Sequence, residues 1–318
     1  MPIVDIDDRS IEGAAAVIRR GGLVAFPTET VYGLGANALD PDAVARIFAA
    51  KGRPATNPLI VHVVSLDAAA EIAYVNEAAR RLASAFWPGP ITFVLPRRAD
   101  IPDIVTAGGP TVAVRQPRHP VAQRLLEACG LPIAAPSANR SESISPTRAQ
   151  HVLASLGDAV DIILDGGPTE VGLESTVVDL TVDPPRLLRP GMISAPEIAN
   201  VLGIWIASAV EGHGIARSPG LMPRHYAPQT PLRLCHDVWA ARRSSTGPVA
   251  VIARTVPEGE SGELVWVLGD NPIDYAARLY DTLHTVDAAG AREILVESVP
   301  DTEPWRAIRD RLIRASAR

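Results

Sequence analysis

The chain contains only two cysteines, Cys129 and Cys235, among its 318 residues. They lie far apart and in no metal-ligand spacing, so we expect a protein of the reducing cytoplasm. The sequence also lacks any run of about 18 apolar residues, which a membrane-spanning helix would need. Its first eight residues are acidic and have little apolar length, so no signal peptide is expected.

Several common active-site motifs are absent as well. There is no Gly-x4-Gly-Lys-Ser/Thr phosphate loop, which excludes a Walker-type ATPase, and no Gly-x-Ser-x-Gly nucleophile elbow. No Cys/His spacing suits a metal, so no protein-bound metal site is predicted. Gly33-Leu-Gly35-Ala-Asn-Ala38 fits a dinucleotide fingerprint, but no acid follows about 20 residues later. We interpret these glycines as shaping a loop after a strand over 23–26.

The overall charge gives no strong attraction to nucleic acid. The net charge is −6, and 47% of the residues are hydrophobic, which describes an ordinary globular protein. A small patch that makes weak contact with tRNA stays open as an alternative. At this length we expect one large domain or two unequal ones.

The order of strand-like and helix-like segments predicts an α/β fold with two domains. Several connections within residues 1–206 are too short for helical crossovers, so we expect a twisted mixed sheet with packed helices there. Residues 207–231 are rich in glycine and proline and are interpreted as a linker or lid. Residues 232–318 alternate short strands and helices, which predicts a smaller C-terminal α/β domain of Rossmann-like type. Helices are expected over 10–20, 42–50, 76–86, 119–129, from Ser145, and near 272–289 and 302–314, with strands over 23–26, 59–64, 91–95, 111–115, 132–135, 161–164, 175–180, 232–235, 249–252, 265–267 and 294–296.

Positive charge gathers at the predicted strand ends. Lys51 and Arg53 lie one residue apart in a Gly/Pro turn that runs into the strand over 59–64, and Arg115 and Arg189 each end a strand. Ser137-Ala-Asn139 forms a turn after the strand over 132–135. Cations and small hydroxyl or amide groups at strand ends are what a polyphosphate site needs. The sequence therefore predicts a nucleotide-using enzyme without the common phosphate loop.

Each of these features also has a plainer explanation. Phe26-Pro-Thr-Glu-Thr30-Val-Tyr-Gly33 carries hydroxyl, carboxylate and phenol groups that suit either a site or a capped turn. His62 lies in an apolar strand, where a core histidine is more common than a ligand, and Arg115 is either solvated or a fork for a carboxylate. The C-terminal arginines are interpreted as complementing the end of the last helix, with RNA binding as the alternative. These arginines are Arg306, Arg309, Arg311, Arg314 and Arg318.

Seven short motifs are distinctive in combination. They are Phe26-Pro-Thr-Glu-Thr-Val-Tyr-Gly-Leu-Gly35, Lys51-Gly-Arg53-Pro54, Asn57-Pro58-Leu59, Trp87-Pro-Gly-Pro90, Ser137-Ala-Asn139, Arg189-Pro-Gly191 and Arg224-His-Tyr226-Ala-Pro228. Together these motifs resemble the YrdC-like family, and the linker and C-terminal segment resemble its two-domain Sua-type members. One departure lies in the linker, where Met222 and Pro223 replace a lysine and an aromatic residue that these members usually carry.

The resemblance implies a nucleotidyltransferase that joins L-threonine, bicarbonate and ATP into L-threonylcarbamoyladenylate and releases pyrophosphate. It implies Mg²⁺ with ATP, a place in tRNA modification, and downstream tRNA threonylcarbamoyl-transfer proteins as partners. The catalytic pair implied is Lys51 and Arg53. The residues implied for ATP are Arg53, Asn57, Thr111, Ser137, Asn139, Ser145, Arg189 and, closing over the nucleotide, Tyr226. Those implied for threonine are Thr30, His62, Arg115, the Ala135 backbone and Ser175.

Two other functions remain open at this point. An RNA-binding module would need no ATP, and its affinity would fall steeply with salt. A carbamoyl-transfer enzyme would use carbamoyl phosphate and would be accompanied by acylphosphatase and zinc-finger domains. The chain has no cysteine clusters for such fingers.

Overall fold

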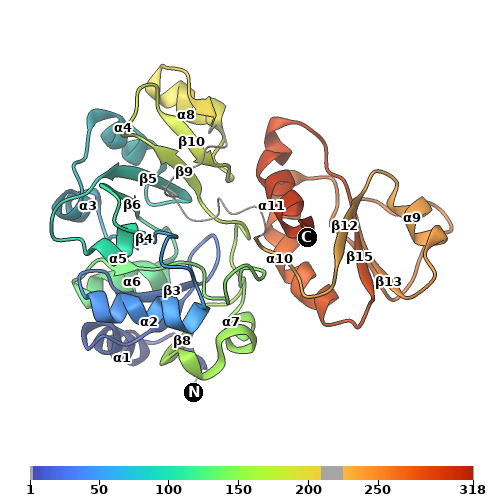
Figure 1. Cartoon of the computed structure of the whole chain (residues 1–318), viewed down its shortest axis with the longest axis horizontal. Coiled ribbons are helices and arrows are strands. Elements are labelled where there is room, and N and C mark those ends of the chain that lie inside the picture. The colour runs from blue at the N-terminus through green and yellow to red at the C-terminus, as the bar shows by residue number, and fades with distance from the viewer. Residues whose placement is uncertain (1–2, 209–224, 318) are drawn as a thin grey trace.

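The computed structural model describes residues 3–208 and 225–317, and within these ranges the strands form two separate sheets. Figure 1 shows the larger, N-terminal unit and a smaller C-terminal unit beside it. Helices α10 and α11 of the smaller unit face the larger one, with the smaller sheet behind them. No helix in the described part of the chain is both long and apolar enough to span a bilayer.

The larger sheet has eleven strands within the described ranges, in the order β1-β8-β2-β3-β7-β4-β6-β5-β9-β10-β11. Its pairings are mixed: β4 runs parallel to β6 but antiparallel to β7, and β5 runs antiparallel to β6. This confirms the expected mixed sheet. The strands are β1 (Ile3–Asp5), β2 (Val24–Phe26), β3 (Gly33–Asn37), β4 (Ile60–His62), β5 (Ile91–Pro96), β6 (Thr111–Arg115), β7 (Ile133–Ala134), β8 (Ile162–Asp165), β9 (Thr176–Asp179), β10 (Arg186–Arg189) and β11 (Ala207–Ser208).

Helices cover this sheet, and their ends follow local sequence signals. In α2, Asp40 caps the first turn, Pro41 takes the first helical position, and Gly52 ends the helix at a φ of 59°. Lys51 is thereby placed in the last turn of a helix that points at the neighbouring strand ends. The helices of this unit are α1 (Asp8–Arg19), α2 (Pro41–Lys51), α3 (Leu66–Ile72), α4 (Glu77–Phe86), α5 (Asp103–Thr106), α6 (Pro120–Cys129), α7 (Ala149–Leu156) and α8 (Ala195–Leu202), with a 3₁₀ turn at Gly157–Ala159.

The smaller unit is a four-stranded, all-parallel sheet in the order β12-β15-β13-β14 among the described residues. Parallel strands need crossover connections: α9 lies between β12 and β13 and α10 between β14 and β15, whereas residues 254–264 join β13 to β14 without a helix. The second α/β unit expected from the sequence is therefore present. Its elements are β12 (Leu232–Cys235), α9 (Val238–Ser244), β13 (Val249–Ala253), β14 (Val265–Val267), α10 (Pro272–Asp287), β15 (Glu293–Glu297) and α11 (Arg306–Ser316), with a 3₁₀ turn at Glu303–Trp305.

Two local predictions are wrong. Gly33–Asn37 is a strand in the middle of the sheet, not a loop, and its glycines serve packing. A Cβ at Gly35 would lie 2.8 Å from side-chain atoms of Phe26 and Ile133. The helix expected from Ser145 begins at Ala149 instead. The Ser145 hydroxyl and the Pro146 carbonyl are used in bonds to other segments, so this stretch stays extended.

The two units share a core. One apolar cluster combines Ile144 and Leu173 of the larger unit with Leu279 of α10 and Leu312 of α11. Gly172, at a φ of 75°, allows the backbones to touch, because a Cβ there would lie 2.4 Å from the carbonyl oxygen of Ala276. The backbones of the two units therefore touch at this point, and the contact between the units is packed as closely as a protein interior. Most of the expected linker, including Ser218, Met222 and Pro223, lies outside the described residues.

Candidate active site

A cavity opens on the larger unit where strand ends from distant parts of the sequence meet. Nine of the predicted site residues line it. Residues from β2–β3, β4, β6, β7, β9 and β10 contribute, so the sheet order brings them together. The lining residues are Thr28, Thr30, Val31, Gly33, Arg53, Ile60, His62, Arg115, Ala135, Pro136, Ser137, Glu174, Ser175, Arg189, His225 and Tyr226.

One end of the cavity is built around Arg115, which is buried at the end of β6. Its Nη2 lies 2.8 Å from Glu29 Oε1, and its Nη1 donates to Thr30 Oγ1 at 2.9 Å. The Thr30 hydroxyl in turn lies 2.8 Å from that of Thr28. Arg115 Nε is buried without a hydrogen-bond partner among the described residues. The guanidinium is thus fixed in place and keeps one donor for a ligand, such as a carboxylate.

Electrostatics at this end depend on that ion pair. Burial alone would raise the pKa of Glu29, but the Arg115 guanidinium and its hydrogen bond outweigh burial, and the pKa lies below its usual value. His62 is fully enclosed, and desolvation together with the Arg115 charge lowers its pKa to about 3. His62 is therefore neutral at physiological pH, and its Nδ1 has no partner among the described residues. It can exchange a hydrogen bond with a substrate but cannot act as a cation.

The other end carries two buried arginines, Arg53 and Arg189, which are suited to bind an anion such as a phosphate. Arg53 donates to the Asn57 and Pro58 carbonyls at 3.1 and 2.9 Å, which aims its guanidinium along the turn before β4. Arg189 donates to the Ser175 carbonyl and hydroxyl at 3.0 and 3.1 Å. Desolvation, partly opposed by Tyr226, lowers the pKa of Arg53 to about 10. Two desolvated arginines at one end of a cavity make a strong anion site.

Lys51 lies beneath this end and does not line the cavity. Its ammonium donates to the Ser137 carbonyl at 2.6 Å and to the Asn139 carbonyl. Burial, with a smaller contribution from the Arg53 charge, lowers its pKa well below the usual value. Lys51 therefore holds the Ser137–Asn139 turn, and only Ser137 of that turn reaches the cavity wall. A direct contact between Lys51 and a triphosphate is not part of this geometry.

Four other predicted residues also lie outside the lining. Asn139 donates to the Arg140 and Ser143 carbonyls, so it shapes its own turn. Asn57 offers its carbonyl to Arg53. Thr111 is four residues before Arg115 on β6, on the same face but about 13 Å away at strand spacing. Ser145 is buried behind the wall and donates to Glu174 at 2.6 Å.

Sequence reasoning missed Glu174 and misread Arg311. Glu174 lines the cavity, and Arg311 of α11 donates to its Oε2 at 2.7 Å. Arg311 is 1% exposed, so it does not complement a helix end in solvent as expected. Burial would raise the pKa of Glu174, but Arg311 and then Arg189 hold it below its usual value. Glu174 lies in the sequence Leu-Glu-Ser-Thr that leads into β9. Nothing in that sequence indicates that the carboxylate pairs with an arginine of the C-terminal unit.

His225 and Tyr226 complete the wall that faces the smaller unit. Both are buried, and their rings lie 4.1 Å apart between centroids. Tyr226 adopts a left-handed backbone, with a φ of 62°, which is unusual for a bulky residue and places its ring inward. Its hydroxyl is buried without a partner among the described residues. Arg224, the first residue of this motif, lies outside the described residues.

The site does not fit a resident magnesium ion. Magnesium prefers carboxylate and water oxygens, yet both carboxylates here are engaged by guanidinium groups, Glu29 by Arg115 and Glu174 by Arg311. The described residues hold no cluster of three or more His, Cys, Asp or Glu side chains. A magnesium ion at this site would be carried in by its ligand.

Comparisons with known proteins identify the family of the chain. The family model Sua5_yciO_yrdC, described as telomere recombination, matches residues 16–191. A second model, the C-terminal domain of threonylcarbamoyl-AMP synthase, matches residues 193–317. The first match covers β2 to β10 of the larger sheet, and the second covers α8, β11 and the whole smaller sheet.

Relatives cover almost the whole chain. Over 98% of its length, the chain is 44% identical to threonylcarbamoyl-AMP synthase of Pyrococcus abyssi, covering 95% of that protein. It is 42% identical to the enzyme of the same name from Bacillus subtilis, covering 98% of this chain and 94% of that one. The crystal structure of P. abyssi Sua5 complexed with L-threonine matches with a TM-score of 0.91 at 42% identity, over 99% of this chain and 98% of that one. The chain therefore belongs to the Sua5–YciO–YrdC family, among the members that also carry the Sua5 C-terminal domain.

Proposed function

We propose that the chain is an L-threonylcarbamoyladenylate synthase, which condenses L-threonine, bicarbonate and ATP and releases pyrophosphate. The observation that carries the proposal is that Arg115, Arg53 and Arg189 open onto a single cavity. The full-length relatives are named for this product, and one of them was crystallised with L-threonine.

The chemistry explains why such a cavity is needed. The threonine amine must first become a carbamate, and the carbamate must then attack the α-phosphorus of ATP. Both reactants are anions, so their repulsion is the main obstacle. Fixed, desolvated cations stabilise the charge of such a transition state, and positioning two reactants together offsets much of the entropy of association.

At the threonine end, Arg115 binds the substrate carboxylate through the donor that it does not use for Thr30. Thr30, neutral His62, the Ala135 backbone and Ser175 surround the rest of the amino acid. Glu29 keeps the guanidinium oriented. No side chain at this end is a suitable general base, because His62 is held neutral by burial with a pKa of about 3 and Glu29 is ion-paired.

At the nucleotide end, Arg53 and Arg189 bind the phosphates, and Ser137 hydrogen-bonds the nucleotide. Three further residues act without touching the nucleotide, because they fix the turns that carry Ser137 and Arg53. They are Lys51, Asn139 and Asn57. Ser145 acts through Glu174, and Tyr226 closes this wall. ATP enters as its magnesium complex, which lowers the charge that the arginines must balance.

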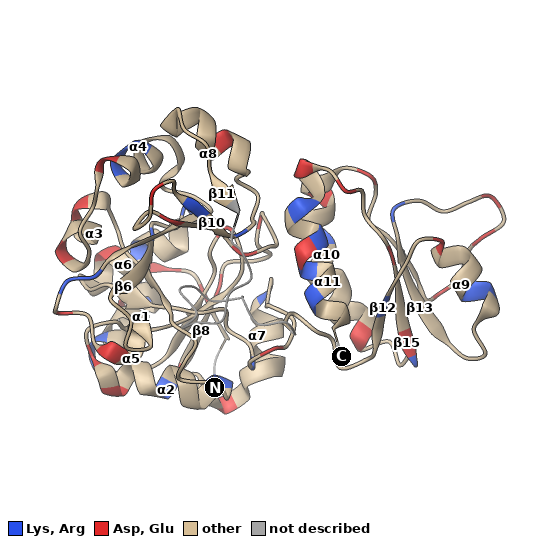
Figure 2. Cartoon of the chain, turned by 45° about the horizontal axis from the view of Figure 1, so that its top comes forward, with Lys and Arg blue, Asp and Glu red and all other residues tan. Residues whose placement is uncertain are grey.

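We further propose residues 1–206 as the catalytic domain, 207–231 as linker and lid, and 232–318 as the C-terminal domain. The enzyme would work in the cytoplasm and pass its product to the proteins that transfer threonylcarbamoyl to tRNA. Both cysteines are free and buried, which suits a reducing compartment. Direct contact with tRNA would be weak, because acidic as well as basic positions lie along α10 and α11 (Figure 2).

The test is an omission series that measures pyrophosphate. We expect release only when protein, Mg-ATP, L-threonine and bicarbonate are all present. Release without threonine or bicarbonate would overturn the proposal. Turnover of carbamoyl phosphate in place of bicarbonate would favour the carbamoyl-transfer alternative, and RNA binding without ATP turnover would favour the RNA-binding one.

A further inference from the structure

The smaller unit supplies no lining residue to the cavity, yet it contacts two residues that do line it. Arg311 of α11 donates to Glu174 at 2.7 Å, and its guanidinium carbon lies 5.1 Å from the ring centre of Tyr226. Tyr280 of α10 donates to the same Glu174 oxygen at 3.1 Å, and its ring stacks on that of Tyr226 at 5.8 Å. Two helices of one domain thus hold one wall of a site in the other.

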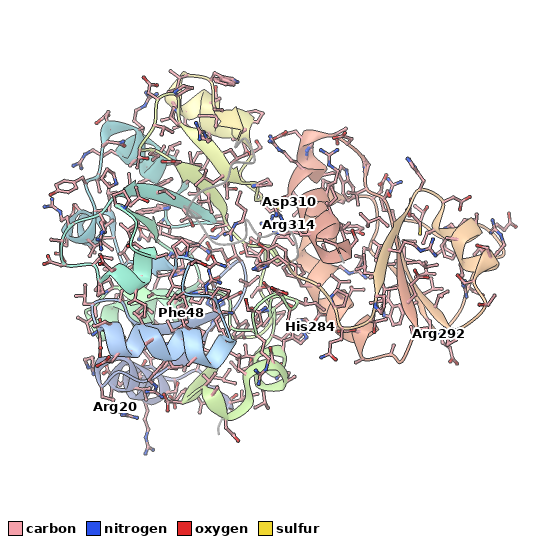
Figure 3. All side chains as sticks on the ribbon, in the orientation of Figure 1. Arg20, Phe48, His284, Arg292, Asp310 and Arg314 are labelled. Carbon is pink, nitrogen blue, oxygen red and sulfur yellow. The ribbon has the colours of Figure 1, made fainter. Side chains whose placement is uncertain are left out.

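The two other nitrogens of the Arg311 guanidinium each make a bond as well. Its Nη2 donates to the Pro190 carbonyl at 3.0 Å, directly after Arg189, and its Nη1 donates to Asp310 at 2.6 Å. Figure 3 labels Asp310 on the side of α11 that faces the larger unit. Because every nitrogen of the guanidinium is bonded and the group is buried, Arg311 has one orientation. It therefore ties together Glu174, Tyr226 and the backbone beside Arg189, three parts of the phosphate end.

We infer that Arg311 is a positioning residue for the nucleotide end of the cavity, through which the C-terminal domain sets the affinity for Mg-ATP. The inference rests on the proposed function, because it takes Mg-ATP as the occupant of that end. Arg311 does not touch the substrate. It fixes Glu174 and Tyr226 in the cavity wall, in a geometry that a lysine could not reproduce, because lysine lacks the planar fork and the stacking face.

The groups that face Glu174 come from several elements, and each limits what the carboxylate can do. They are Arg311 and Tyr280 from the C-terminal domain, Arg189 from β10, Ser145 from the segment before α7, and His225 and Tyr226 from the segment before β12. Without Arg311, Arg189 would be the remaining arginine that acts on Glu174 among the described residues, and we expect it to pair with that carboxylate in place of a ligand phosphate. Weaker phosphate binding is the expected consequence.

The experiment is calorimetric titration of the full chain with the magnesium complex of a non-hydrolysable ATP analogue, which reports affinity and stoichiometry separately. For Arg311→Met we expect the Kd to rise about tenfold or more, a loss of ~1.4 kcal/mol, with the stoichiometry unchanged. A purely structural role would lower the stoichiometry and the melting temperature but leave the Kd of the folded fraction as in the wild type. The Kd for L-threonine, bound mainly by other elements, should change little.

A control variant, a double variant and a milder variant complete the experiment. Arg309→Met removes an arginine from the same helix that pairs with Asp301 at the surface, and it should leave the Kd unchanged. Glu174→Gln alone should raise the Kd, and the Glu174→Gln/Arg311→Met double variant should be no worse than the weaker-binding single variant, because the two act as a unit. If Arg311→Met fails to fold, Tyr280→Phe removes only the hydroxyl that holds Glu174 and should raise the Kd by a smaller factor.

A wild-type Kd in both Arg311→Met and Tyr280→Phe, or Kd effects of the Glu174 and Arg311 changes that simply multiply, would overturn the inference. Failure of the proposed function looks different. In that case the wild-type chain itself would release no pyrophosphate in the complete mixture, whatever the variants bind.

Discussion

Two buried carboxylate–guanidinium pairs flank the cavity, and they differ in where their partners come from. Glu29, in the loop between β2 and β3, and Arg115, at the end of β6, belong to the same unit and lie 2.8 Å apart. Glu174 and Arg311 belong to different domains, at 2.7 Å. The first pair is formed entirely within the larger unit, where the Arg118 backbone N–H also holds Glu29, whereas the second exists only while α10 and α11 pack against that unit. The end of the cavity that we propose for threonine is thus built within one unit, and the end that we propose for the nucleotide has contacts from both.

The largest effect should come from breaking the intradomain pair. Arg115→Ala leaves Glu29 buried without its cation, so we expect a loss of about 3–5 kcal/mol in the free energy of unfolding. Threonine binding should be lost while some Mg-ATP binding survives, as denaturant unfolding and calorimetry would show. The matched control is Arg118→Ala, an exposed arginine paired with Glu170, which should change stability by less than about 0.5 kcal/mol. Intact threonine affinity in the folded Arg115 variant would refute the carboxylate assignment.

A second change acts on the nucleotide end from inside the larger domain. Lys51→Ala leaves the Ser137 and Asn139 carbonyls without their donor, at a cost of about 1–3 kcal/mol for unsatisfied buried groups. Because the turn that carries Ser137 is released, Mg-ATP affinity should fall far more than threonine affinity. Equal losses for both ligands in titrations would show that Lys51 does not serve the nucleotide end selectively.

The interdomain contact can be perturbed without touching either ion pair. Gly172→Ala puts a Cβ 2.4 Å from the Ala276 carbonyl, so the loop and α10 must move apart. We expect a loss of about 1–3 kcal/mol and weaker Mg-ATP binding, with threonine binding retained. Gly167→Ala is the control, since it has a similar φ of 78° but no atom within 4 Å of the new Cβ. If both variants behave alike, backbone strain accounts for the effect and the domain contact does not.

The effect that is smallest at neutral pH, and that grows only on acidification, concerns the buried histidines, one near each end. Burial lowers the pKa of His62 and of His225 to about 3, so each stays neutral when folded and takes a proton when unfolded. Their contribution to stability is complete above the ordinary value of 6.5 and is lost as pH falls from there toward about 3. We expect each to add about 1.4 kcal/mol per pH unit to that loss. Denaturant unfolding of His62→Asn across this range should show a shallower slope than the wild type, and an unchanged slope would mean that His62 is protonated when folded.

The sequence predicted the intradomain end of the site better than the interdomain one. Arg115, Thr30, His62 and Ser175 lie on or beside short strands whose apolar runs are easy to recognise, and the structure brings all four to one cavity. Arg311 was misread because helical periodicity marks a buried face without saying what lies against it. Its partner, Glu174, is 137 residues away.

The local errors have the same cause. Gly33–Asn37 has no β-branched residue and no clear alternation of apolar and polar residues. It forms a strand because its backbone pairs with β2 on one side and β7 on the other. The start expected for α7 at Ser145-Pro146 was a reasonable cap signal, but the Ser145 hydroxyl is bound to Glu174. In both cases a tertiary contact overrides a local preference.

The most direct test of the central claim, that one cavity lets carboxylated threonine meet ATP, is to identify the product with carbon-labelled bicarbonate. Mass spectrometry of the complete reaction should show a single labelled adenylate that contains threonine, formed in equal amount with pyrophosphate. Label in a product without threonine, or release of ADP and inorganic phosphate in place of pyrophosphate, would contradict it.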